Sequence, residues 1–321
     1  MFNSFLFVEQ RPYLEWKKDV NLRSKIGVDE ETFNFILNLL SEELNSFHGP
    51  KSLSDEGKPL LSNENLLALL FNWLRQYNSV RSLSVDFHIP ATTVEDYLPK
   101  LVDVVHEGLK GWVVPPPRIR RKVETGPLTG TCMFVDSFPI ELRVRPDFQI
   151  KESKDRSEYY WYAGSRVHHW AIKVQTTFGL DNKIWDSSKA VPYAFSDQRL
   201  CRESKVPSIL ARNENLRGVG DLHYSKEQQF IQKIKNPKEK EDKERNKEIE
   251  GVRSSVENTI SRLKDWKILE SRYRGDRQNL VLVEKFTRII CAVVNIEIEK
   301  HPIRSNLSNL KQSRRQQKKK R

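Results

Sequence analysis

The sequence predicts an α/β protein in which an all-helical N-terminal region precedes a mixed β-sheet covered by helices. Apolar residues recur at helical spacing through the first hundred positions, and a segment rich in Pro, Gly and basic residues follows at 111–130. Short β-rich runs then come before long helical patterns. With 321 residues, 37% of them hydrophobic, the chain is long enough for about two domains with cores of their own.

Composition excludes several classes of protein. The hydrophobic fraction is too high for a disordered chain. The longest apolar stretch, residues 66–74, is interrupted by Asn72 and falls far short of the about 20 residues that span a bilayer. The N-terminus lacks the basic start and long apolar run of a signal peptide, and the three cysteines form no CxxC pair that would indicate a zinc ribbon. We therefore expect a soluble intracellular protein without a membrane partner.

The helical region is expected at residues 1–110. Residues 28–44 carry an apolar stripe at three-and-four spacing, and Asp29 precedes the stripe in the position of an N-cap, which predicts one helix. Loop residues separate this helix from a second one, which begins after Ser62 and continues through Arg75.

A helix-turn-helix pattern lies at about residues 60–101. One predicted helix ends near His88, Pro90 lies in a short turn, and a second helix begins at Thr92 and ends before Pro99. The apolar residues expected to join the two helices are Leu83, Phe87, Ile89, Val94 and Leu98. In a DNA-binding motif, the residues facing base edges would be Thr92, Thr93, Glu95 and Asp96. Because two of these are acids, a packed helical hairpin without a DNA-binding role is the alternative.

The net charge of +12 is concentrated at one end of the chain. Eight positive charges and no acid lie in residues 304–321, which predicts a disordered basic tail (303–321) suited to nuclear import or to phosphate backbones. A solvated tail without a receptor is the alternative. The linker at 111–130 holds a second basic cluster, namely Arg118, Arg120, Arg121 and Lys122. Charges of both signs nearly cancel in residues 233–250, which we interpret as a solvated helix or a flexible insertion.

The second domain is expected at residues 131–302. Its predicted strands are 131–135, 140–144, 167–178, 183–187 and 216–220, and its predicted helices are 225–234, 250–269 and 279–300. Two acids each end one of the strand-like runs, Asp136 the first and Asp221 the last. Open α/β sheets place their sites just beyond strand ends, so these carboxylates could meet at one edge.

A third acid, Glu257, lies beside the apolar face of the predicted helix 250–269. A carboxylate near an apolar face needs a partner, and Arg253 is a candidate one turn earlier. Two carboxylates about 4 Å apart repel by roughly 4 kcal/mol at an effective dielectric of 20, so three together require a cation. Hard oxygen ligands select Mg²⁺ or Mn²⁺, and two such ions can act on a phosphodiester. Each acid alone could equally be a turn residue or an N-cap, and spacing does not decide between these interpretations.

Six blocks of the chain resemble, in order, the motifs of one family. LSNENLLALLFNWLRQYNSVRSLSVDFHIPATTVEDYL resembles the helix-turn-helix block that precedes the nuclease in PIF/Harbinger and related insertion-sequence transposases. The blocks that resemble their DDE endonuclease motifs are VDSFPIEL, WYAGSRVHHWAIKVQ, FSDQRL, VGDLHY and VRSSVENTISRLKDWKIL. The resemblance covers about residues 60–300.

The resemblance implies a ribonuclease-H-like fold and a metal-dependent nuclease or strand-transfer activity on double-stranded DNA. It assigns the catalytic and metal-binding carboxylates to Asp136, Asp221 and Glu257, with Mg²⁺ or Mn²⁺ as cofactor, and makes Asp197 a possible auxiliary ligand. The residues it implies for positioning DNA or the first strand are Tyr162, Gly164 and Lys173. The chain departs from the family pattern after the second Asp, where His223 could lie near the metal or serve in packing.

Two other functions stay open at this point. The protein could be a domesticated, non-catalytic DNA-binding or adaptor protein that keeps the transposase fold. It could also be a basic nucleic-acid-binding protein, in which case Asp136 and Asp221 would lie far apart. Further expectations are a nuclear location, a homo-oligomer and an accessory DNA-binding protein that supplies specificity.

Overall fold

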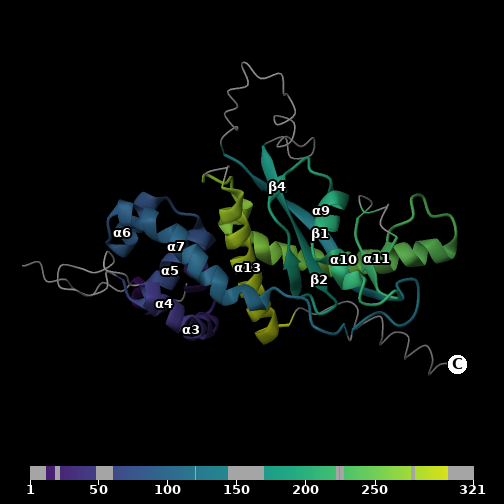
Figure 1. The fold of residues 1–321 in the computed structure, drawn as a ribbon, viewed down its shortest axis with the longest axis horizontal. Coiled ribbons are helices and arrows are strands. Elements are labelled where there is room, and N and C mark those ends of the chain that lie inside the picture. Colours follow the sequence, from purple (N-terminus) through teal and green to yellow (C-terminus); the bar gives the residue numbers. More distant parts are fainter. Residues whose placement is uncertain are drawn as a thin grey trace, which may run out of the picture. The chain divides into compact units, whose positions relative to one another are not determined.

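The computed structural model describes residues 12–18, 22–47, 61–119, 121–143, 170–221, 224, 228–275 and 279–302. The chain forms two compact units. The helical unit takes its described residues from Met1–Leu109 and Asp265–Ser271, and the sheet unit takes them from Lys110–Lys264 and Arg272–Arg321. The predicted fold class, helices first and then a mixed sheet covered by helices, is confirmed (Figure 1). No helix among the described residues is long and apolar enough to cross a membrane.

The helical unit contains seven described helices before the linker and one that returns from the far end of the chain. Its elements are α1 (Pro12–Lys18), α2 (Leu22–Ile26), α3 (Glu30–Leu39), α4 (Ser41–Phe47), α5 (Asn63–Gln76), α6 (Val80–Phe87), α7 (Ala91–Leu109) and α12 (Lys267–Glu270). The core of this unit contains a chain of aromatic rings. Phe71 of α5 meets Phe33 edge-on at 6.1 Å and Trp266 edge-on at 5.8 Å. Gly27 has a positive φ of 85°, and any Cβ there would meet the Trp266 ring at 2.7 Å.

Two helix boundaries differ from the sequence prediction. Asp29 caps α3 as expected, accepting a hydrogen bond from the Thr32 amide at 2.7 Å, but the helix predicted over 28–44 is divided at Leu40 into α3 and α4. Pro99 does not end the helix in which it lies, because α7 continues to Leu109. An interior proline costs about 3 kcal/mol, and the buried apolar stripe that α7 presents on both sides of Pro99 offsets this cost.

The hairpin of α6 and α7 forms as predicted. His88 ends α6 in the left-handed conformation with φ 52°, and the Ser84 hydroxyl donates to the Ile89 carbonyl at 2.6 Å. The side chains buried between the helices are the predicted ones, Leu83, Phe87, Ile89, Val94 and Leu98. Glu95 and Asp96 are exposed on α7, where Asp96 pairs with Lys100.

The sheet unit contains six described strands and four described α-helices. Its elements are η2 (Lys110–Trp112), β1 (Thr131–Glu141), β2 (Ala171–Gly179), β3 (Ile184–Ser187), β4 (Val191–Pro192), α9 (Asp197–Glu203), α10 (Val206–Leu210), β5 (Arg217–Val219), β6 (Phe230–Ile231), α11 (Lys240–Lys264) and α13 (Leu280–Lys300). The strand order is β3-β2-β1-β5-β6, with β4 also paired to β2. β1 is antiparallel to β2 and parallel to β5, so the sheet is mixed.

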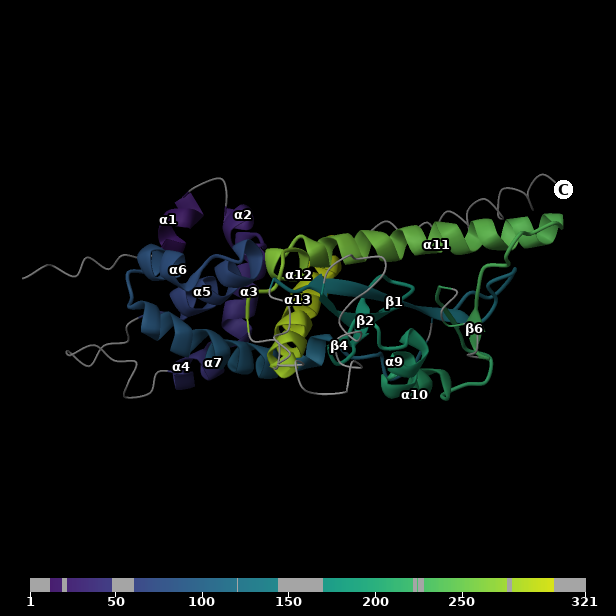
Figure 2. The ribbon, with the colours of Figure 1, turned by 90° about the horizontal axis from the view of Figure 1, so that it is seen from above.

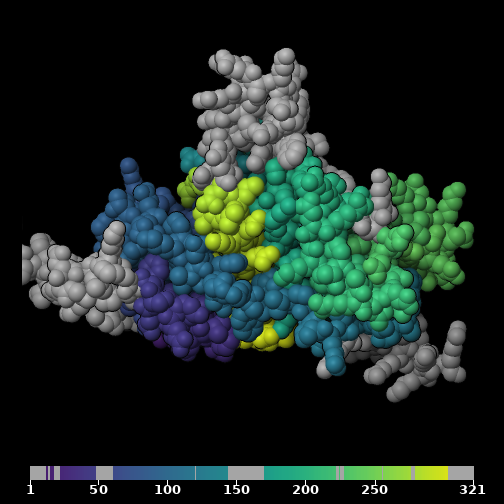
Figure 3. Space-filling view, in the orientation of Figure 1, coloured from purple at the N-terminus to yellow at the C-terminus, as the bar shows by residue number. Residues whose placement is uncertain are grey.

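Helices cover both faces of this sheet (Figure 2). On one face, α9 and α10 bury Cys201, Val206 and Ile209 against Met133 and Val135 of β1. On the other face, α11 packs along β1, and α13 packs against α11 and β3. The space-filling view shows the start of α11, in green, exposed at the surface (Figure 3). The three cysteines are buried free thiols.

The sheet unit also corrects two details of the sequence prediction. β1 is one strand over 131–141, not two strands broken after residue 135, so Asp136 lies within it and not beyond its end. The predicted helix 225–234 is wrong over its described part, where 228–229 form a turn and β6 follows. Of the two interpretations of the charged stretch 233–250, the structure shows the helix, which begins at Lys240 and has a largely exposed first part.

The segment Asp265–Ser271, expected within the second domain, groups with the helical unit. α11 ends at Lys264, and Trp266 then lies in the core of the helical unit with 1% of its surface exposed. The chain rejoins the sheet unit at once, since the Tyr273 amide donates to the Glu141 carbonyl at 2.7 Å. α11 is therefore covalently followed by a segment that belongs to the other unit.

Candidate functional site

Asp136 lies at the centre of the sheet, on β1, between β2 and β5. It pairs across the ladder with Thr176 of β2, and its carboxylate accepts the Ser137 amide at 2.9 Å. Side chains alternate between the two faces of a strand. Asp136 therefore points to the face covered by α11, whereas Ser137 points to the opposite face, where its hydroxyl contacts Asp197 at the start of α9.

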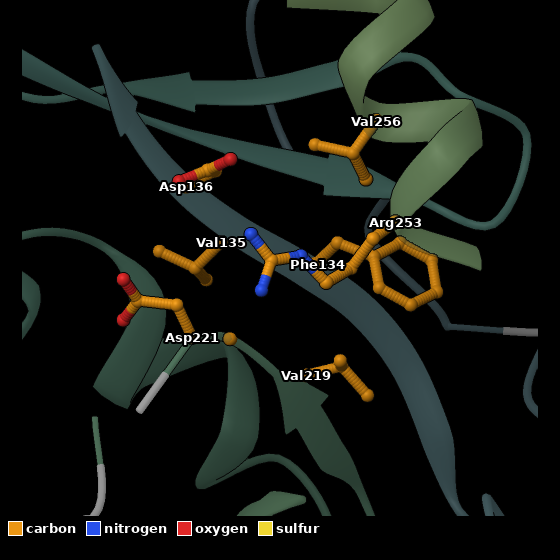
Figure 4. A pocket seen from close by; sticks show the side chains of 8 residues that line it. Phe134, Val135, Asp136, Val219, Asp221, Arg253 and Val256 are labelled. Atoms are coloured by element: carbon orange, nitrogen blue, oxygen red, sulfur yellow. The ribbon is translucent and has the colours of Figure 1, made fainter. Parts of the chain in front are cut away.

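Asp221 follows the end of β5, the parallel neighbour of β1. Its side chain and that of Asp136 line one pocket, which we call the acidic pocket (Figure 4). The other lining residues are Phe134, Val135, Val219, Gly220, Arg253 and Val256. The two acids that the sequence placed at strand ends thus meet, which excludes the hypothesis that they lie far apart.

Burial dominates the electrostatics of the acidic pocket. It raises the pKa of Asp136 from 3.8 to about 6. The Ser137 amide and the positive charge of Arg253 oppose this rise, and the carboxylates of Asp221 and Asp197 add to it. A second positive charge in the pocket would therefore stabilise the ionised form of Asp136, and a divalent cation is one group that can supply it.

Glu257 does not reach this pocket. It is exposed on α11, whereas its neighbours Arg253 and Val256 line the acidic pocket. Figure 4 shows the guanidinium of Arg253 extending from α11 toward Asp136 and Asp221. Among the described residues, no three His, Cys, Asp or Glu side chains are grouped so that they could hold a metal ion. The oxygen donors of the two aspartates suit Mg²⁺ or Mn²⁺, and the third expected donor lies outside their pocket in this conformation.

Asp197, the possible auxiliary ligand, begins α9 and is engaged elsewhere. Its Oδ1 accepts from Lys173 Nζ at 3.0 Å and from the Ser137 hydroxyl at 2.9 Å. The Lys173 side chain is 8% exposed, that of Asp197 is 16% exposed, and the ammonium lies 5.2 Å from the centre of the Tyr193 ring. Asp197 is thus half of a nearly buried ion pair on the α9 face of the sheet.

A second polar group on the α9 face was missed by the sequence prediction. The Tyr224 hydroxyl donates to Gln175 Oε1 at 3.1 Å, and Gln175 Nε2 donates to the Ser204 hydroxyl at 3.4 Å. Tyr224 and Gln175 are each 1% exposed. Tyr224 lies three residues after Asp221 in the block VGDLHY, and Ser137 directly follows Asp136 in the block VDSFPIEL. This closeness to the acids is the sequence signal that could have identified both residues.

Several sequence-predicted residues lie outside the described part of the chain. These are Tyr162, Gly164 and His223, together with the basic tail. Of the three residues expected to position DNA or the first strand, Lys173 alone is described, and it is the partner of Asp197.

A mixed sheet with helices on both faces, one carboxylate on β1 and a second just after its parallel neighbour β5, is consistent with an α/β fold of the ribonuclease-H-like kind. The family model described as DDE superfamily endonuclease matches residues 135–295, which include the acidic pocket, and the chain belongs to this family. No curated protein and no solved structure matches the chain.

Proposed function

We propose that this protein is a transposase-type DNA endonuclease or strand transferase of the PIF/Harbinger kind, dependent on Mg²⁺ or Mn²⁺. The observation that carries the proposal is the meeting of Asp136 and Asp221 in one pocket inside the region matched by the endonuclease family. Glu257 is the third proposed carboxylate. When bound, the metal would polarise a phosphodiester and activate the attacking hydroxyl or water.

The protein side chains have separable roles in this proposal. Asp136, on a central strand, offers one fixed oxygen donor, and Asp221, after β5, offers a second. Arg253 reaches the same pocket and balances part of their negative charge while no cation is bound. Glu257 follows Arg253 by four residues on α11, so both lie on one side of that helix. A side-chain exchange that withdraws Arg253 and admits Glu257 would complete the three carboxylates.

Double-stranded DNA is the proposed substrate. The basic tail would add phosphate contacts and direct the protein to the nucleus. The α6–α7 hairpin is a candidate DNA-binding element, but the exposed Glu95 and Asp96 are unfavourable near phosphate. An accessory DNA-binding protein that supplies sequence specificity, and a homo-oligomer that pairs two DNA ends, therefore belong to the proposal.

A second function is favoured by a different observation. The position of Arg253 in the acidic pocket and the exposure of Glu257 suit a domesticated, non-catalytic adaptor that keeps the fold. In such a protein the positive charge of Arg253 would take the place of the metal. The two functions differ in whether the protein binds a divalent cation.

The experiment that tests the proposal combines Mn²⁺ calorimetry with a DNA-nicking assay on wild type, Asp136→Asn and Glu257→Gln. An active enzyme binds Mn²⁺ and nicks DNA, and both variants lose the nicking and weaken the binding. Asn258→Ala, a neighbouring exposed change on α11, serves as the control and keeps both properties. A wild type that binds no Mn²⁺ and nicks no DNA would refute the enzyme and leave the adaptor.

A further inference from the structure

The α9 face of the sheet, opposite α11, carries a partly buried polar network that no step of the proposed reaction uses. It connects both ends of α9 to the two strand segments that bear Asp136 and Asp221. We propose that α9 braces these segments from that face, and that Ser137 and Tyr224 are positioning residues for Asp136 and Asp221. This inference rests on the proposed function, since it concerns the geometry of the same two carboxylates.

The first arm of the brace fixes β1 beside Asp136. Asp197, the first residue of α9, accepts a hydrogen bond from the Ser137 hydroxyl at 2.9 Å and is held in turn by Lys173 at 3.0 Å. Lys173 lies on β2, where its backbone pairs with Pro139, two residues beyond Ser137. Ser137 is therefore bound through its side chain to α9 while its amide donates to the carboxylate of Asp136. One residue thus links the orientation of Asp136 to the position of α9.

The second arm fixes the turn that carries Asp221. Ser204, the C-cap of α9, accepts from Gln175, and Gln175 accepts from the Tyr224 hydroxyl. The Tyr224 amide donates to the Asp221 carbonyl at 3.2 Å, so the phenol and the acid belong to one tight turn. A Cβ at Gly220 would meet the Tyr224 ring at 2.5 Å, which explains why glycine precedes the acid. The ring also stacks on Phe230 at 5.3 Å.

The two arms converge on β2, where Lys173 and Gln175 are adjacent on the same face. Both are buried, with 6% and 1% of their surface exposed. A buried donor or acceptor that loses its hydrogen-bond partner lowers the stability of the fold. Each hydrogen bond of the network therefore resists displacement of the residues that it joins. Groups that orient metal ligands typically change metal affinity about 10–100-fold when they are removed. Asp197 in this arrangement acts through Ser137 and does not itself ligate the metal.

Charge-neutral variants give the sharpest test, because they leave the field at the pocket unchanged. Ser137→Ala and Tyr224→Phe each delete one hydroxyl of the network. Tyr13→Phe is the matched control, since Tyr13 is 3% exposed and its hydroxyl donates to Asn34 at 3.3 Å in the helical unit. Mn²⁺ alone is titrated into each full-length protein by calorimetry, with wild type and Asp136→Asn as references. Hydrogen exchange of β2 in EDTA confirms that each variant is folded.

The expected result is that Ser137→Ala and Tyr224→Phe weaken Mn²⁺ binding by about 10-fold or more, whereas Tyr13→Phe binds as wild type. In the nicking assay Tyr224→Phe lowers kcat and leaves the KM for DNA unchanged, because its side chain is buried. Wild-type Mn²⁺ affinity in Tyr224→Phe overturns the brace, even if Ser137→Ala fails to fold. Failure of the proposed function is recognised separately, as a wild type that binds no Mn²⁺ or an Asp136→Asn that binds it equally well.

Discussion

The partly buried carboxylate of Asp136 allows a quantitative prediction about the stability of the metal-free protein. Asp136→Asn keeps the shape of the side chain and an oxygen that accepts the Ser137 amide, but removes the charge. Burial raises the pKa of Asp136 to about 6, so the ionised carboxylate destabilises the folded state at neutral pH. We expect metal-free Asp136→Asn to be more stable than wild type at about pH 7.5, above the folded pKa.

The magnitude follows from the difference between the folded and unfolded pKa of Asp136. A pKa of about 6 against 3.8 corresponds to about 3 kcal/mol at 1.36 kcal/mol per unit. Because the folded pKa is the higher one, Asp136 does not destabilise the fold below pH 3.8, and its destabilising contribution grows as the pH rises to about 6. The advantage of the variant is therefore absent at acid pH, grows through this range and is constant above it.

The assay is a urea titration in EDTA at several pH values, read by hydrogen exchange of peptides covering Thr131–Glu141. This readout reports the sheet unit alone, which matters because a chain with two compact units need not unfold in one step. Asp86→Asn, an exposed change in the helical unit, is the control and shifts stability by less than about 0.5 kcal/mol. Adding Mn²⁺ at about 1,000 Kd should reverse the order, since a ligand at that concentration stabilises the protein that binds it by roughly 4.1 kcal/mol. Identical pH profiles for wild type and Asp136→Asn would refute the reasoning.

Three further predictions concern the rest of the molecule. Lys173→Met leaves the nearly buried Asp197 carboxylate without its cationic partner, so urea denaturation should show a free energy of unfolding lower by about 3–5 kcal/mol. The double variant Lys173→Met/Asp197→Asn should recover most of this loss. Equal stability of the single and double variants would contradict the buried pair. Trp266→Ala removes a ring from the core of the helical unit and should lower the free energy of unfolding of that unit by about 3–5 kcal/mol. The loss is measured as faster hydrogen exchange in α5. Unchanged exchange in α5 would show that Trp266 does not belong to this core. Deletion of residues 305–321 should flatten the salt dependence of DNA affinity, measured by binding at about 50 and 200 mM salt. The same deletion should reduce nuclear entry, measured by microscopy. An unchanged slope would show that the tail does not contact DNA.

Local sequence signals predicted much of the helical unit. Asp29 caps α3 because a short polar side chain can satisfy a free amide of the first turn. The apolar residues around His88 predicted the α6–α7 hairpin because they are close in sequence and face one another across a tight turn. The same reasoning failed at Pro99, where a local rule was outweighed by the apolar stripe that α7 buries along its whole length.

Tertiary packing decided the details of the acidic site. Strand alternation places Asp136 and Ser137 on opposite faces, but only the packed structure shows that α11 covers one face and α9 the other. Asp197 was expected near the metal because it is an acid in a family motif, yet its hydrogen bonds go to Ser137 and Lys173. A sequence pattern gives the type of a side chain and not the partner that neutralises it.

The sequence by itself predicted the fold class and the endonuclease family, because the periodicity of the elements and the order of the motifs can be read along the chain. It suggested that Asp136 and Asp221 could meet, and the parallel pairing of β1 with β5 brings them to one pocket. Only the tertiary structure decided that Arg253 lines the pocket, that Glu257 remains exposed beside it and that Trp266 belongs to the helical unit. Those outcomes depend on how α11 is rotated against β1 and on which core has room for a large ring. Both are set by contacts between residues far apart in the chain, which periodicity and spacing do not encode.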